Sequence, residues 1–215
     1  MNEILGYGED ALTFWGLKRR ISEILKKLND QTKPSSCLIF FRPSFGRRGR
    51  EGRAEFGEFD AIVASSTDIY LIESKWDRRL RSRRNEIALG KEQIRRHKIF
   101  LWYLKNWDAP KYSGDWEKFK NDFEGNFTSA GNFPNKKIAA IGSTLAENLE
   151  FVLNKLQEHC KSFSCEYKPR NVLLYFYDGS KSEEISEVVA ENLSFKVVPI
   201  DYSKYTSDNF ITLDC

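Results

Sequence analysis

The stretch FGEFDAIVASSTDIYLIESKW, residues 56–76, holds two runs rich in β-branched and aromatic residues on either side of a polar Ser-Ser-Thr turn. Two such runs with so short a separation predict a β-hairpin, with strands over Glu55–Val63 and Ile69–Trp76. Apolar residues occupy both alternating positions of each run, which is typical of a sheet covered on both faces. The stretch therefore predicts a buried central sheet.

Charged side chains inside a buried hairpin need a partner, and this hairpin carries Asp60, Glu73 and Lys75. Glu73 and Lys75 are two residues apart and share one face of their strand. With a two-residue turn, cross-strand partners have numbers that add up to 133. Asp60 then lies opposite Glu73, and Glu58 lies opposite Lys75. Adjacent carboxylates repel unless a cation or a proton separates them, so the residues predict either an oxygen-liganded Mg²⁺ site or a structural ion cluster neutralised by Lys75.

The other segments predict an α/β or mixed α+β chain. Residues 107–135 lack a firm periodicity and predict an irregular insertion, and the Gly- and Arg-rich residues 42–53 predict an exposed loop. Apolar periodicity predicts helices over 8–29, 85–106, 143–163 and 182–193, and strands over 37–41, 136–142, 171–178 and 195–200.

Composition excludes several classes of protein. The 215 residues are 40% hydrophobic and 30% charged, which suits one sizeable core. The apolar runs are too short to cross a bilayer and the start lacks a signal pattern, so we expect a cytoplasmic protein with no membrane partner. Two histidines exclude a His-rich metal site, and the four cysteines lack paired CxxC spacing. The groups that remain as candidates for catalytic chemistry are carboxylates, lysines and a metal with oxygen ligands.

The net charge of +3 is unevenly distributed along the chain. Residues 42–98 contain fifteen Lys and Arg against nine Asp and Glu, so their balance is +6. A local excess of this kind favours a polyanionic partner, and a mixed solvated surface is the alternative.

The spacing of Asp60, Glu73 and Lys75, on a strand–turn–strand unit after one helix and before a basic one, resembles the active-site hairpin of the PD-(D/E)XK nuclease superfamily. The family has a restriction-endonuclease-like αβββαβ core, with a mixed central sheet flanked by helices and the motif on its second and third strands. The resemblance implies an α/β nuclease core over residues 1–142. It leaves residues 143–215 as a C-terminal α/β extension, packed on the same sheet or forming a small appendage.

Carried over residue by residue, the resemblance implies that Asp60 and Glu73 are ligands of Mg²⁺, for which Mn²⁺ would substitute. The backbone carbonyl of Ser74 is a candidate third ligand, and Lys75 would act on the attacking water. One departure is Phe59, which stands before Asp60 where the family name has Pro, although that position varies widely.

Two further residues extend the implied site. Many family members add an acidic residue from the first helix, for which Glu9 is the candidate and Asp10 and Glu3 are rivals. Glu9 as a charge that complements the helix dipole is the alternative. RecB-like members add a Gln on the following helix, which Gln93 matches, and an ordinary solvated Gln is the alternative. Glu58 would be the second carboxylate if the register slipped by one residue.

Arginines bracket the motif in sequence and fit a phosphate backbone, which binds basic side chains without reading bases. They are Arg47, Arg48, Arg50 and Arg53 in the loop, Arg78, Arg79, Arg81, Arg83 and Arg84 after the motif, and Arg95 and Arg96 on the next helix.

The expected function is therefore a metal-dependent nuclease that hydrolyses phosphodiester bonds, with DNA as the favoured substrate, by attack of a metal-activated water. A homodimer is consistent with the family, in which many members cut two strands with two copies. The alternatives are a nucleic-acid-binding protein of the same fold that does not cleave, and a protein-interaction module.

Overall fold

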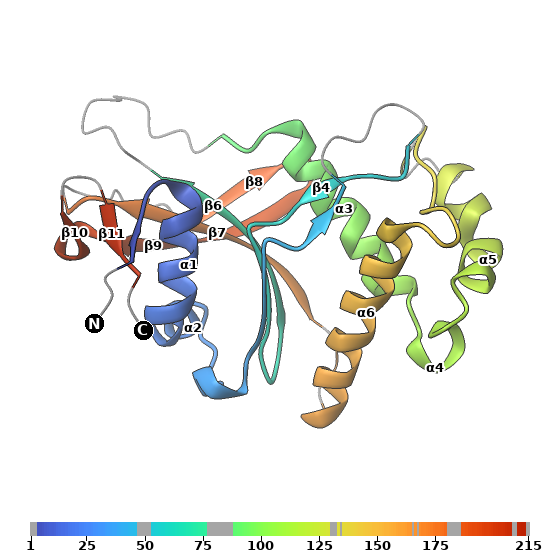
Figure 1. The fold of residues 1–215 in the computed structure, drawn as a ribbon, viewed down its shortest axis with the longest axis horizontal. Helices are drawn as coiled ribbons and strands as arrows, with labels where there is room; N and C mark the ends of the chain where they lie inside the picture. Colours follow the sequence, from blue (N-terminus) through green and yellow to red (C-terminus); the bar gives the residue numbers. More distant parts are fainter. Residues whose placement is uncertain are drawn as a thin grey trace.

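The computed structural model describes residues 4–46, 53–76, 88–129, 133, 135–164, 166, 168–179, 186–207 and 210–213. Within these residues the chain is α/β, as expected, with a six-stranded mixed sheet flanked by helices (Figure 1). In spatial order the strands are β2 (Leu38–Phe41), β5 (Ala61–Ala64), β6 (Ile69–Trp76), β7 (Pro169–Tyr177), β9 (Leu193–Asp201) and β8 (Glu187–Ala190).

The sheet is antiparallel on one side of β6 and parallel on the other. Strands β2, β5 and β6 pair antiparallel, whereas β6, β7 and β9 run parallel and β8 closes the far edge antiparallel to β9. Strands β7, β8 and β9 all follow residue 143, so the C-terminal third of the chain belongs to the same sheet as the hairpin.

The register of the hairpin is the one that the sequence predicts. Ala64 pairs with Ile69, and the numbers of all the paired residues of β5 and β6 add up to 133. The Ser65 N–H donates to the Asp68 carbonyl at 2.9 Å, which leaves residues 66–67 as the two-residue turn.

Helices cover both faces of the sheet, which confirms the expectation from the doubly apolar strands. Val63 and Ile72 pack toward α1 and α2, and their neighbours Ile62 and Leu71 pack toward α3, α5 and α6. Figure 1 shows these two groups of helices on opposite sides of the sheet. The helices are α1 (Glu9–Arg19), α2 (Ile21–Lys27), α3 (Lys91–Asn106), α4 (Ala109–Tyr112), α5 (Trp116–Ser129) and α6 (Thr144–Ser162). The predicted helix over 8–29 is thus divided at Arg20.

Short strands and turns complete the described chain. They are β1 (Leu5–Gly6), β3 (Ser44–Phe45), β4 (Gly57–Glu58), β10 (Thr206–Ser207) and β11 (Phe210–Thr212), with single 3₁₀ turns at Pro34–Ser36 and Ser203–Tyr205. Strand β11 pairs with β1 and β10, and β3 pairs with β4. None of the described helices is both long and apolar enough to cross a membrane.

The stretch 107–135 is expected to be irregular, but its residues 109–112 form α4 and its residues 116–129 form α5. Phe119, Phe123 and Phe127 recur every four residues, which is a helical pattern that the surrounding Gly, Asn and Pro obscure. The rings of Phe119 and Phe127 lie 6.0 and 4.7 Å from the Trp102 ring of α3, measured between centroids. The segment is therefore part of the core beneath the sheet.

Two other predictions of secondary structure are wrong. Residues 136–142 form no strand, and Ile138 and Ala139 are buried without strand pairing. The prediction failed because a short apolar run has the same pattern in a strand and in a buried coil. The strand that pairs with β6 on the side away from β5 is instead β7. Glu187–Ala190, within the predicted helix 182–193, is strand β8, in keeping with its two adjacent valines.

We expect Phe119→Ala to lower the free energy of unfolding by about 3–5 kcal/mol, because the ring is fully buried among other aromatic rings. Phe151→Ala on α6 is the matched control, since Phe151 is 58% exposed, and it should cost less than about 1 kcal/mol. Urea unfolding measures both. Equally small losses would show that α5 is not part of the core.

Candidate functional site

The candidate site lies at the start of β5, where β6 continues beyond its pairing with β5. Pairing with β5 stops at Ile72, whereas β6 runs on to Trp76. On the edge that β5 has left, the Ser74 N–H donates to Asp60 Oδ2 at 2.7 Å, and the Trp76 N–H donates to Glu9 Oε2 at 3.0 Å. Two carboxylates thus replace a strand as acceptors, and they bring the starts of α1 and β5 together at one edge.

A cleft of about 670 Å³ opens at this edge. Its lining contains five carboxylates and two guanidinium groups, together with Phe56, Gly57 and Gln93. The charged residues are Glu9, Glu58, Asp60, Glu73 and Glu92, and Arg42 and Arg96. An excess of acidic groups in a concave, low-dielectric site attracts cations and repels a lone anion.

Glu73 is fully buried, and donors from α3 surround its carboxylate. Oε1 accepts from Arg96 Nε at 3.0 Å and lies 3.1 Å from His97 Nε2. Oε2 accepts from Gln93 Nε2 at 2.7 Å and from Arg96 Nη2 at 2.8 Å. A carboxylate offers about four acceptor positions, so the ones on Glu73 are all taken.

A second layer holds His97 in place. Its Nδ1 lies 2.7 Å from Asn171 Oδ1 on β7, and Asn171 Nδ2 donates to the Ser194 carbonyl on β9 at 3.2 Å. That second bond orients the amide so that its oxygen faces the ring, and His97 Nδ1 is then the donor. Because Nδ1 carries a proton, His97 Nε2 donates to Glu73 only when both ring nitrogens are protonated. The chain of contacts ties α3 to β6, β7 and β9.

The three central carboxylates differ in their pKa. Burial and the charge of Glu73 raise the pKa of Asp60 to about 7, against the opposing hydrogen bond from Ser74. Burial likewise raises the pKa of Glu9 above its ordinary value, although the charge of Lys75 acts the other way. Burial would also raise the pKa of Glu73, but the His97 bond and the Arg96 charge outweigh it and hold that pKa low.

The donor set fits a hard divalent cation in its chemistry. Mg²⁺ prefers carboxylate and carbonyl oxygens, and a cation would relieve the repulsion that raises the pKa of Asp60. Ser74 supports the fit, because the N–H and C=O of one strand residue point to the same side, which places its carbonyl on the Asp60 edge. Glu73, however, has its acceptor positions occupied. In the described part of the chain, no group of three or more His, Cys, Asp or Glu is arranged to hold a metal ion.

The structure brings most of the predicted central residues together. Glu9, Asp60, Glu73 and Gln93 line one cleft, and Gln93 contacts Glu73 directly. Lys75 is half-buried at the end of β6 with its charge acting on Glu9, but it is not among the described residues that line the cleft.

The two rivals of Glu9 differ in what the structure shows of them. Asp10 is about half exposed and pairs with Arg42. Glu3 lies outside the described residues. The carboxylate of Glu9, by contrast, reaches β6 and the cleft.

Glu58 does not lie opposite Lys75, contrary to expectation. The strand predicted over 55–63 divides before β5, and Glu58 belongs to β4, where it pairs with Ser44. Its carboxylate accepts from Arg42 Nη2 at 2.8 Å. Glu58 thus lies on the wall of the cleft rather than on the hairpin.

The predicted phosphate-binding arginines are described in part. Arg53 is exposed, Arg95 pairs with Glu92 at 3.1 Å, and Arg96 pairs with Glu73. The others lie outside the described residues: Arg47, Arg48, Arg50, Arg78, Arg79, Arg81, Arg83 and Arg84.

Sequence reasoning missed His97 and Asn171. His97 follows Gln93 by four residues and so shares its face of α3, a signal that was available. Asn171 lies 98 residues beyond Glu73 in the chain, and no local pattern links the two.

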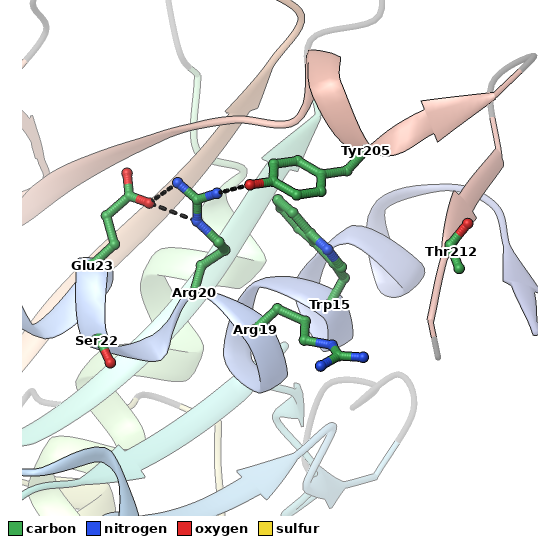
Figure 2. A pocket seen from close by; sticks show the side chains of 7 residues that line it. All are labelled: Trp15, Arg19, Arg20, Ser22, Glu23, Tyr205 and Thr212. Atoms are coloured by element: carbon green, nitrogen blue, oxygen red, sulfur yellow. Dashed lines mark hydrogen bonds and ion pairs between the residues drawn. The ribbon is translucent and has the colours of Figure 1, made fainter. Parts of the chain in front are cut away.

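A second pocket, of about 700 Å³, lies between α1, α2 and the C-terminal segment. Figure 2 shows the Arg20 guanidinium between the Glu23 carboxylate and the Tyr205 hydroxyl. The same guanidinium lies 5.3 Å from the centre of the Tyr205 ring and 5.8 Å from that of Trp15. Because Glu23 neutralises Arg20 and no carboxylate cluster is among the lining residues, the first cleft is the stronger candidate for chemistry.

Known proteins give no guide to this site. No protein-family model matches the chain, and no curated protein or solved structure matches it. The geometry of the site is therefore the basis on which we infer its function.

We expect Asp60→Asn to stabilise the protein above neutral pH. Asp60 has a pKa of about 7 in the fold but about 4 when unfolded, so the fold favours its protonated form. Its contribution to stability is complete below pH 4 and is lost as the pH rises to 7. The neutral Asn avoids this loss, so its advantage should grow from near zero at pH 4 to about 2–4 kcal/mol at pH 8.

Urea unfolding of both proteins across this pH range measures the difference. Asp108→Asn, which removes an exposed carboxylate at the start of α4, is the matched control. If the stability curves of wild type and Asp60→Asn stay parallel from pH 4 to pH 8, the pKa of Asp60 is not raised in the fold.

Proposed function

We propose that the protein is a metal-dependent nuclease that hydrolyses phosphodiester bonds, with DNA as its substrate. The observation that carries the proposal is the convergence of Glu9, Asp60 and Glu73 on one acidic cleft, from α1, from the start of β5 and from β6. The carboxylates that line the cleft outnumber its arginines, so a divalent cation would relieve their mutual repulsion.

The order of elements supports a restriction-endonuclease-like core. A helical segment precedes β2, β5 and β6, helices follow, and β7 then joins the sheet beside β6. This order is αβββαβ, with β7 in place of the strand expected over 136–142. Asp60 comes directly before the second strand of the three and Glu73 lies on the third.

The residues of the cleft have separable roles in this proposal. Asp60, Glu9 and the Ser74 carbonyl would hold a divalent cation such as Mg²⁺, with Glu73 joining them. When bound, the cation supplies charge stabilisation to a phosphoryl oxygen and lowers the pKa of water. Lys75, whose charge acts on Glu9, would orient the attacking water.

Electrostatics explain why such a protein would need both its metal and its basic segments. The excess of carboxylates over arginines in the cleft would disfavour a phosphodiester, so a bound cation would favour its entry. The arginines outside the described residues would hold the flanking phosphates, and this binding would weaken as salt rises.

A second candidate function has its own supporting observation. Gln93, Arg96 and His97 satisfy Glu73 completely without a metal, as in a structural ion cluster. A protein that binds nucleic acid without cleaving it would keep this arrangement.

We expect labelled DNA to be cleaved in the presence of Mg²⁺ or Mn²⁺, with linear, forked and junction substrates compared. Lys75→Ala and Asp60→Asn should each slow cleavage by about a hundred-fold or more, because general acid–base and charge stabilisation are lost. DNA binding, measured by fluorescence anisotropy, should change little in Lys75→Ala. Lys105→Ala, at the exposed end of α3, is the matched lysine control.

The outcomes separate the candidates. Binding with no cleavage on any substrate and with either metal would favour the non-catalytic protein. Absence of both binding and cleavage would refute both candidates and leave a protein-interaction module.

A further inference from the structure

The guanidinium of Arg96 is held in a mostly buried position between Glu73 and its neighbours in the cleft. The side chain is 13% exposed, and it makes two hydrogen bonds to Glu73. Its guanidinium carbon lies 5.5 Å from the centre of the Phe59 ring. Gly57 also leaves room for the guanidinium, because a Cβ there would lie 3.1 Å from Arg96 Nη1. Gly57 also has a φ of +110°, which disfavours any other residue.

Arg96 and a cation cannot both bind the Glu73 carboxylate. Arg96 takes one acceptor position on each oxygen of Glu73, and Gln93 and His97 take the others. A metal ion could reach Glu73 only if a donor left, and a positive guanidinium beside it would repel the ion. Of the three donors, Arg96 carries the fixed charge and lines the cleft.

We propose that Arg96 exchanges partners: a phosphodiester in the cleft draws its guanidinium away from Glu73, which then binds the divalent cation. The inference rests on the proposed function and adds its regulation. The structure shows the state before the exchange, in which the guanidinium of Arg96 neutralises Glu73 in place of the cation. Phosphate and metal then bind cooperatively, and neither fills the site well alone.

The chemistry of guanidinium makes the exchange feasible. Its planar fork binds phosphate and carboxylate in the same bidentate manner, so the bonds lost to Glu73 are regained on the substrate. The charge of Glu73 is in turn compensated by the incoming cation. Gln93 and His97 remain as hydrogen-bond partners, and Asn171 holds His97 in position, so Glu73 stays oriented while Arg96 moves.

The test measures metal binding directly rather than activity. Binding of Mn²⁺ is followed by electron paramagnetic resonance, with and without dimethyl phosphate as a minimal phosphodiester and at matched ionic strength. In the wild type, dimethyl phosphate should strengthen Mn²⁺ binding by about five-fold or more, and Mn²⁺ should strengthen dimethyl phosphate binding by the same factor.

Arg96→Gln should bind Mn²⁺ about five-fold or more tightly than the wild type without phosphate, and dimethyl phosphate should no longer change that affinity. Arg96→Lys, which keeps the charge but loses the fork, should lie between the two. Arg20→Gln breaks a comparable pair with Glu23, away from the cleft, and should behave as the wild type. Because the wild-type titration needs no variant, the test stands even if Arg96→Gln fails to fold.

Two results would overturn the exchange: a wild-type Mn²⁺ affinity that ignores dimethyl phosphate, or an Arg96→Gln affinity equal to that of the wild type. A wild type that cleaves DNA but shows no such coupling would refute the exchange alone. Mn²⁺ binding that is unchanged in Asp60→Asn, together with no cleavage, would refute the proposed function and the exchange with it.

Discussion

The burial of the Glu73 carboxylate is the constraint on which the rest of the site depends. A charge fully removed from water inside a sheet is tolerated only with a complete set of hydrogen bonds and a compensating charge. That requirement accounts for the three donors on one side of α3, where Gln93, Arg96 and His97 follow at three and four residues. The demand then extends to β7, because His97 needs Asn171 to fix its orientation.

The unpaired edge of β6 imposes the second constraint. Backbone N–H groups that lose a neighbouring strand need other acceptors, and Asp60 and Glu9 supply them. The same two carboxylates line the cleft with Glu73, and burial together with the charge of Glu73 raises the pKa of Asp60. The oxygens that accept hydrogen bonds from the edge of β6 are therefore the same ones that the proposed cation site would use. For this reason a structural ion cluster and a metal site look alike in sequence.

Local patterns predicted the parts of the fold that depend on near neighbours. The Ser66–Thr67 turn and the alternation around it give the hairpin register, and hence the approach of Asp60 to β6. Longer-range features were beyond such patterns. The run at 136–142 has the pattern of a strand, but a strand also needs a partner in the sheet. The free side of β6 is paired with β7, which comes later in the chain. The aromatic residues of 107–135 looked irregular because their partners, such as Trp102, lie on another helix.

The sequence by itself determined the hairpin, its register and the identity of the carboxylates, because turn chemistry and strand alternation act over a few residues. Tertiary structure decided how those carboxylates are used. It placed Glu9 on the exposed edge of β6, moved Glu58 onto β4, and seated Arg96 and His97 on Glu73. These contacts join residues between 14 and 67 positions apart, and desolvation inside the folded sheet, which no local pattern encodes, selects them.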